Sequence, residues 1–212
     1  MSKERPILFS TEMVQAIQAG RKTQTRRLLR HIRAYSIKTD LPANNPPCKP
    51  GDILWVRETW QRVYNFDDGD QPIEGTGRYV YYADNPMPFD YWVDADTGEH
   101  KEQMPWKPSI HMPKKAARIF LKVKDVRIER LTDITEEQAE AEGCAGWHIE
   151  ITGGPWGVED DPDEGTAVDD FKRVWDSTIK SADRDKYGWE ANPWVWVITF
   201  ERCDKPKGWC LP

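Results

Sequence analysis

The chain has at residues 20–27 the run GRKTQTRR, in which Lys22 and Thr25 stand three residues apart inside a cluster of arginines. A threonine hydroxyl becomes an effective nucleophile only when another group takes its proton. Lys22 can take it if crowding by Arg21, Arg26 and Arg27, together with partial burial, lowers its pKa. Arg26 or a backbone N–H would then stabilise the oxyanion of a tetrahedral intermediate. A simpler role is equally open, in which the cations bind phosphate and Thr25 hydrogen-bonds within a turn.

The charge around this run differs from that of the whole chain. Residues 13–39 contain seven Lys or Arg and no acidic residue, whereas the 212-residue chain has a formal net charge of -6. A local basic site on an acidic protein indicates an anionic ligand, most simply a nucleotide or a nucleic acid. Arg21, Arg26 and Arg27 are the predicted phosphate contacts. Ribonuclease chemistry, which needs Lys, Arg and a general base around a phosphodiester, also suits such a cluster.

The elements on either side of the run determine where it lies. A short strand is predicted at residues 6–9, and Ser10 or Thr11 can cap a helix that ends at Gly20, which places the basic run in a turn. A turn at residues 50–52 leads into a predicted strand over 53–60. That strand contains Trp55 and Arg57, which we predict as further ligand contacts because Trp can stack on a base and Arg can bind phosphate.

Further elements are read from periodicity. Residues 78–83 and 194–201 read as strands, and alternation over 117–130 predicts a long strand with a bulge near Asp125. A capping box at 135–138 opens a short helix that ends at Gly143, and a second amphipathic helix spans 168–180. This order lacks βαβ alternation, so we expect an α+β fold, a small and mostly antiparallel β-barrel with flanking helices. We predict a single domain over 1–212 with irregular insertions at about 62–112 and 145–166.

Several classes of protein are disfavoured by composition. No apolar run is long enough to cross a bilayer, and the first residues lack the apolar region of a signal peptide, so we expect a cytoplasmic protein without membrane contact. The four cysteines (Cys48, Cys144, Cys203 and Cys210) fit no zinc spacing and are expected to be free thiols. We predict neither a cofactor nor a metal, and a structural zinc on Cys203, Cys210 and a histidine is the minor alternative.

These motifs point to a family. The run at 20–27 resembles the G-x-K-x-x-T-x-R signature of ASCH domains, which have a PUA-like fold, a small β-barrel with flanking helices. Residues 50–57, 131–143 and 194–200 resemble the P-G-D turn with its strand, the "L-T…A-x-x-E-G" helix and the closing strand of that family, in the same order. The chain most resembles the larger ASCH proteins of bacteriophages and prophages, which implies the cytoplasm of a bacterial host.

The resemblance implies several activities. Some small bacterial ASCH proteins are amidohydrolases that remove the acetyl group from N4-acetylcytidine with a Lys, a Thr and a Glu. The first two fall on Lys22 and Thr25, and Glu142 is the best match for the third, with Glu140 or Glu137 as alternatives. Glu142 would relay the proton or activate water beside Lys22. Other members resemble ribonucleases. The predicted partner is RNA, a nucleotide or a modified nucleoside, including single-stranded nucleic acid, and a non-catalytic phage accessory protein that binds RNA or a host protein remains an alternative.

Overall fold

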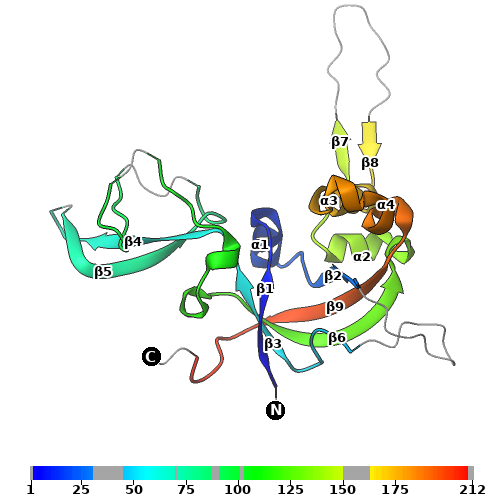
Figure 1. Cartoon of the computed structure of the whole chain (residues 1–212), viewed down its shortest axis with the longest axis horizontal. Coiled ribbons are helices and arrows are strands. Elements are labelled where there is room, and N and C mark those ends of the chain that lie inside the picture. The colour runs from blue at the N-terminus through cyan, green and yellow to red at the C-terminus, as the bar shows by residue number, and fades with distance from the viewer. Residues whose placement is uncertain are drawn as a thin grey trace, which may run out of the picture. The chain divides into compact units, whose positions relative to one another are not determined.

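A computed structural model describes residues 2–30, 45–69, 71–86, 91–100, 103–149 and 163–209 (Figure 1). The chain divides into two compact units. The first unit comprises residues 1–18, 51–122 and 202–212, and the second comprises 19–50 and 123–201. Each unit has its own helices and core.

The largest sheet has five strands in the order β1-β3-β6-β9-β2. Their bounds are Glu4–Leu8 (β1), Ile53–Arg57 (β3), Phe120–Arg130 (β6), Trp194–Cys203 (β9) and Gln24–Leu28 (β2). β1 pairs with β3 in parallel, whereas β3 with β6 and β9 with β2 are antiparallel. A five-stranded sheet and four α-helices among the described residues confirm the α+β class. Pairing among the described strands does not close a barrel, so the barrel stays a prediction.

The first unit contains β1, β3, the start of β6 and helix α1 (Thr11–Gln18). α1 buries Val14, Ala16 and Ile17 because these residues recur on one helical face. A two-stranded antiparallel ribbon, β4 (Trp60–Phe66) and β5 (Pro72–Tyr81), occupies part of the segment expected to be an irregular insertion. Short 3₁₀ turns lie at Ser109–His111 and Lys114–Ala116. The core beside the ribbon includes Trp55, Trp60, Met112, Phe120 and Trp209.

The second unit contains β2, most of β6 and β9, and helices α2 (Glu136–Ala141), α3 (Ala167–Thr178) and α4 (Arg184–Tyr187). Val195 and Val197 of β9 share a core with Ala139 of α2 and with Phe171 and Trp175 of α3. One face of this part of the sheet is therefore covered by helices. The remaining elements are the ribbon β7 (Trp147–Ile149) with β8 (Asp163–Gly165) and 3₁₀ turns at Leu131–Asp133, Ser181–Asp183 and Trp189–Ala191.

The predicted capping box of α2 is confirmed, since the Thr135 side chain accepts from the Gln138 N–H and the Gln138 side chain accepts from the Thr135 N–H. The prediction that the basic run lies in a turn was wrong for most of it. Gly20 does turn, with φ of 76°, but Gln24–Leu28 forms β2, because its residues pair with β9. The β-strand propensity of these five residues is too weak to predict a strand. β2 forms because it pairs with β9, about 170 residues later in the chain.

The other expectations concern cysteines, metals and membranes. Cys48, Cys144 and Cys203 form no disulfide with one another, and Cys210 lies outside the described residues. Across the described ranges there is no group of three or more His, Cys, Asp or Glu side chains placed to hold a metal ion. No helix within them is long and apolar enough to span a membrane. Most of the expected insertion at about 145–166 lies outside the described residues.

Candidate functional site

The basic run is attached to two elements of the second unit. The backbone N–H of Thr23 donates to the Ala141 carbonyl at the end of α2, with an N–O distance of 2.8 Å. The Thr23 carbonyl in turn accepts from the Phe200 N–H of β9 at 2.9 Å. Both main-chain groups of Thr23 are thereby fixed, so the residue before it, Lys22, is directed at the end of α2.

Lys22 meets Glu142, the residue that immediately follows α2. The Lys22 Nζ lies 2.8 Å from Oε2 of Glu142 and 2.6 Å from its backbone oxygen. The side chain of Lys22 is fully buried and that of Glu142 is 4% exposed. A buried ammonium is stable only when it is paired, and here it receives both a carboxylate and a carbonyl. The alternatives for the acidic partner, Glu137 and Glu140, are exposed.

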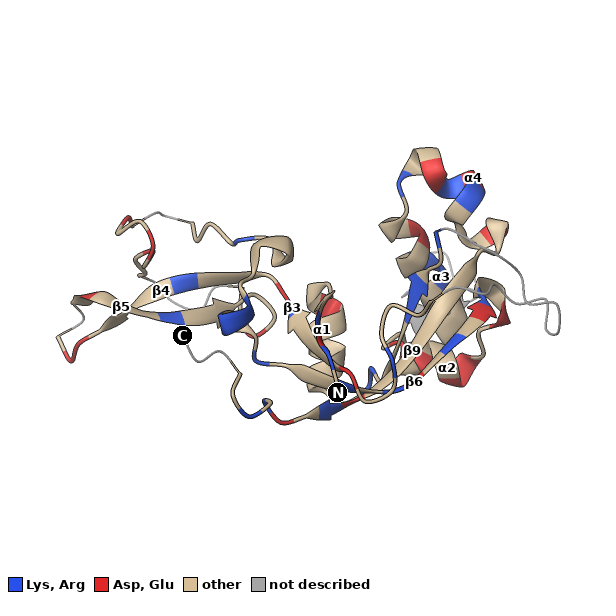
Figure 2. Cartoon of the chain, turned by 60° about the horizontal axis from the view of Figure 1, so that its bottom comes forward, with Lys and Arg blue, Asp and Glu red and all other residues tan. Residues whose placement is uncertain are grey.

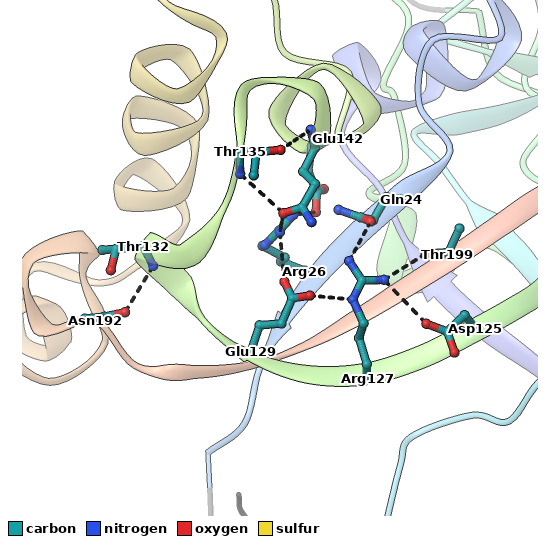
Figure 3. A network of polar contacts seen from close by, with 11 residues as sticks. Gln24, Arg26, Asp125, Arg127, Glu129, Thr132, Thr135, Glu142, Asn192 and Thr199 are labelled. Carbon is teal, nitrogen blue, oxygen red and sulfur yellow. Dashed lines mark hydrogen bonds and ion pairs between the residues drawn. The ribbon is translucent and has the colours of Figure 1, made fainter.

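Arg26 of β2 is the second cation on the same carboxylate (Figure 3). Its Nη1 lies 3.3 Å from Oε1 of Glu142, and its Nη2 lies 3.2 Å from Oε2 of Glu129 and 2.6 Å from Oε1 of Gln138. Burial lowers the pKa of Arg26, and the charges of Glu142 and Glu129 oppose that shift. The Glu142 carboxylate therefore bridges two buried cations. Helix α2 carries further acidic residues in its first turn (Figure 2).

A second arginine, Arg127 of β6, extends the network beyond Glu129. Figure 3 shows Glu129 between Arg26 and Arg127, with Asp125 and Thr199 beyond. Arg127 also donates through Nη2 to Oε1 of Gln24 at 3.3 Å. The sequence analysis missed this part of the site. The alternate charged residues Asp125, Arg127 and Glu129 on one strand were the available signal, since residues two apart share a face.

Two buried donors of β2 have no acceptor among the described residues, namely Nε2 of Gln24 and Nε of Arg26. Gln24 is 5% exposed and Arg26 is 4% exposed. The orientation of the Gln24 amide is fixed because its oxygen accepts from Arg127, and a flip would turn its NH₂ group against the guanidinium. Gln24 and Arg26 lie two residues apart, so both donors belong to one face of β2.

Thr25 lies on the opposite face of that strand. In the ladder with β9, Arg26 is opposite Val197, which belongs to the core under the helices, whereas Thr25 is opposite Ile198. Strand alternation therefore directs the Thr25 side chain away from the face of Arg26 and Glu142. The structure brings together Lys22, Arg26 and Glu142 and leaves Thr25, which is buried, on the other side.

The remaining predicted contacts are dispersed. Arg21 is exposed and donates to the Gly143 carbonyl at 3.2 Å. Arg27 is half-buried on the Thr25 face; burial lowers its pKa, and the charge of Glu142 opposes this. Trp55 and Arg57 belong to the first unit, where Trp55 is buried in the core and the Arg57 guanidinium lies 5.6 Å from the centroid of the Trp55 ring.

Comparisons with known proteins add one structural likeness. No family model matches the chain, and no curated protein matches it. Among solved structures the chain is similar to the crystal structure of protein EF3133 from Enterococcus faecalis V583, described as family-model DUF984. The TM-score is 0.39 and the sequence identity 13%, over 98% of this chain and 84% of that one.

Proposed function

We propose that this chain binds a nucleotide, a modified nucleoside or RNA through the basic run at residues 20–27, and that it is an ASCH protein of the larger phage and prophage type. The four motifs that occur in the family's order support the family assignment, and with it a PUA-like barrel and the cytoplasm of a bacterial host. Arg21, the exposed cation that opens the run, supplies long-range attraction for phosphate.

The observation that carries this proposal is the pair of buried donors on β2, Nε2 of Gln24 and Nε of Arg26, which have no acceptor in the described part of the chain. A buried donor left unpaired costs roughly 1–3 kcal/mol. An oxygen of a phosphate or a base carbonyl would satisfy both donors, and Lys22 and Arg26 make the surroundings favourable for an anionic oxygen. Together these groups form a receptor for an oxygen-rich ligand.

Binding is tested with a short fluorescent single-stranded RNA, followed by anisotropy over a range of salt concentrations. We expect affinity to fall as salt rises, because phosphate contacts release counterions. Gln24→Leu should weaken binding by about tenfold, the value of one lost charged hydrogen bond. Thr199→Val is the matched control, since Thr199 is opposite Gln24 in the ladder and contacts Arg127 only at 3.4 Å. A flat salt response, or equal affinities for the two variants, would contradict the proposal.

Hydrolysis of an N-acyl nucleoside such as N4-acetylcytidine is the second candidate. It is favoured by the Lys22 amine at 2.8 Å from the Glu142 carboxylate. Glu142 would take a proton from water, the resulting hydroxide would attack the acyl carbon, and Lys22 would stabilise the oxyanion. The C–N bond then breaks, the base nitrogen gains the proton and acetate leaves. This route needs no threonine nucleophile, in keeping with Thr25 on the other face of β2.

Acetate release from N4-acetylcytidine separates the routes. We expect Glu142→Gln to abolish turnover and Thr25→Val to retain it. Loss of turnover in a folded Thr25→Val variant would instead favour the threonine nucleophile, and no release by the wild type would reject this substrate. Incubation with labelled RNA tests the remaining alternatives: shortened products indicate a ribonuclease, and binding without cleavage favours the non-catalytic accessory protein.

A further inference from the structure

The first unit contains a second basic segment, which neither function proposed above uses. Residues 103–122 contain five Lys or Arg and no acidic residue, a contrast similar to that of residues 13–39. The acidic residues of this unit are concentrated elsewhere, since ten Asp or Glu lie between positions 67 and 102. The exposed cations of the basic segment are Lys114, Lys115 and Lys122.

A segment near the C-terminus packs against this one through Trp209. The Trp209 ring contacts Phe120 of β6, with 4.7 Å between the ring centroids, and Nζ of Lys114 lies 4.2 Å from the centroid of the same indole. Trp209 is 5% exposed, so its burial holds the preceding residues against the first unit. These preceding residues contribute two further exposed lysines, Lys205 and Lys207.

The register of β6 places Lys122 beside this contact. Phe120 and Lys122 are two residues apart, and the ladder with β3 is regular across them, with Trp55 opposite Phe120 and Ile53 opposite Lys122. Residues two apart on a strand share a face, so Lys122 lies on the face that Trp209 covers. The two segments that meet at Trp209 thus carry five exposed lysines, which we call the lysine surface: Lys114, Lys115, Lys122, Lys205 and Lys207.

The lysine surface is only partly neutralised. Lys114 pairs with Glu4 at 2.6 Å, and Asp204 is the acidic residue beside Lys205. Five lysines against these two carboxylates give a net charge of +3. The other four ammonium groups have no ion-pair partner within the described ranges. Like charges held close together repel one another, so an anionic partner would stabilise this arrangement.

The chemistry of the surface favours a phosphate backbone over other anionic partners. Each ammonium is a point charge on a flexible stem, which suits a phosphate and makes no base-specific contact. Lysine is depleted at interfaces between proteins. Binding to an anionic membrane is strengthened by apolar side chains that enter it, whereas the rings of Trp209 and Phe120 beneath the lysines are 5% and 2% exposed.

We propose that the lysine surface binds the phosphodiester backbone of a nucleic acid without recognising its bases. It is separate from the basic run at residues 20–27, and the proposal holds whether or not that run binds RNA. If both bind, each unit of the chain contacts the same class of ligand.

The experiment follows the anisotropy of a fluorescent oligouridylate of about 20 nucleotides with the full chain over a range of salt concentrations. Each contact with a single-stranded phosphate contributes about 0.7 to the steepness of log affinity against log salt concentration. We expect Lys122→Gln/Lys205→Gln/Lys207→Gln to reduce that steepness by about 2 and to weaken binding at low salt by about tenfold. These lysines are exposed and have no ion-pair partner among the described residues, so the fold is retained.

The matched control removes the same charge from the second unit. Lys172→Gln/Lys180→Gln/Lys186→Gln changes three lysines on or beside α3 and α4, and it should leave the steepness unchanged. Parallel titrations with oligothymidylate separate RNA from DNA, because an effect seen with one oligomer alone assigns the surface to that nucleic acid. An effect seen with both assigns it to the backbone that they share.

Three outcomes would overturn the proposal. The first is equal steepness in the wild type and the Lys122/Lys205/Lys207 variant, and the second is an equal reduction in the control variant. The third is binding to phosphatidylserine vesicles that this variant loses while its salt dependence with both oligomers is unchanged. Gln24→Leu, which tests the basic run, removes an uncharged donor and should weaken binding without changing the steepness, so failure of one site is distinguishable from failure of the other.

Discussion

Each unit contains an ion cluster anchored by at least one buried side chain, and the two clusters have opposite composition. In the second unit one carboxylate, Glu142, holds the cations Lys22 and Arg26. In the first unit one guanidinium, Arg118, holds the carboxylates Glu58 and Asp84. The side chains of Lys22 and Arg26 are fully buried, whereas that of Asp84 is 50% exposed.

The difference determines how each cluster responds when a partner is lost. An arginine keeps its charge at every accessible pH, so Arg26 depends on its carboxylates. A carboxyl group can instead take a proton. Burial raises the pKa of Glu58 although its hydrogen bonds from Arg118 oppose this. For Arg118, burial would lower the pKa, but the bonds to Glu58 and Asp84 outweigh it and raise the pKa. Arg26 therefore keeps its charge when a carboxylate partner is lost, whereas Glu58 can respond to the loss of Arg118 by taking up a proton.

The largest effect is expected when the shared carboxylate of the second unit is neutralised. Glu142→Gln keeps the shape of the side chain and removes the carboxylate that pairs with the fully buried Lys22. Breaking a buried pair by removing one partner costs about 3–5 kcal/mol. We expect a loss of that size in the free energy of unfolding, measured by urea denaturation and far-UV circular dichroism at neutral pH.

Glu140→Gln is the matched control, because Glu140 is an exposed carboxylate on α2 only two residues away. Its effect should stay within about 0.5 kcal/mol, as is usual for surface positions. Equal and small losses in the two variants would show that Glu142 does not hold the buried cations, and would also remove the basis for its catalytic role.

A smaller and pH-dependent effect is expected for Arg118→Met in the first unit. The variant leaves Glu58 unpaired, so its folded-state pKa moves further above the ordinary 4.5. Between the unfolded-state pKa of Glu58 and its higher folded-state pKa, the folded state binds more protons than the unfolded state. The free energy of unfolding of the variant therefore falls as pH rises through this interval. We expect a loss of about 3 kcal/mol at pH 8 that becomes smaller as pH falls and Glu58 takes up a proton. Urea midpoints across this range measure it.

The double variant Arg118→Met/Glu58→Gln is the control for that assignment. With the carboxyl group gone, the added pH dependence should disappear, while the loss of the Arg118 contact with the Tyr81 ring persists. If the single variant shows the same loss at pH 5 and pH 8, then Glu58 is not the group that adjusts, and the contrast between the two clusters is wrong.

The sequence predicted the elements that have strong local signals. The helix at α1, the long strand at β6 and the capping box of α2 follow from periodicity and from Thr135 and Gln138. β2 was missed because a five-residue strand of polar residues depends on its ladder with β9. The ribbon of β4 and β5 was seen only in part, since its pairing joins segments with irregular composition.

In the candidate site, too, the features that depend on contacts between distant parts of the chain could not be predicted from local sequence. Pairing of Lys22 with Glu142 followed from a family resemblance, since the two residues are 120 positions apart and no local pattern connects them. The face of Thr25 could not be predicted without β2, because only a strand's register decides which side a residue takes. Arg127 was overlooked because its charge looked like one of many on an exposed strand, whereas its partners come from β2, β6 and β9.

The smallest effects should come from the outer carboxylates, Glu129 in the second unit and Asp84 in the first. Glu129 is 21% exposed and lies between Arg26 and Arg127, so we expect Glu129→Gln to cost about 1–2 kcal/mol in urea denaturation at pH 7. Asp84 is half exposed, and its ion pair with Arg118 is screened by water, so Asp84→Asn should cost about 0.5 kcal/mol or less.

The pH dependence of the Asp84 effect has the opposite sign to that of Glu58. Partial burial alone would raise the pKa of Asp84, but hydrogen bonds from Arg118 and Gln18 outweigh it and lower the pKa below the ordinary 3.8. Its contribution is therefore present above that value and is lost as pH falls through the lowered pKa. At pH 7, Asp84→Asn should lower the free energy of unfolding less than Glu129→Gln does. The opposite order would contradict the expectation that the more exposed ion pair contributes less to stability.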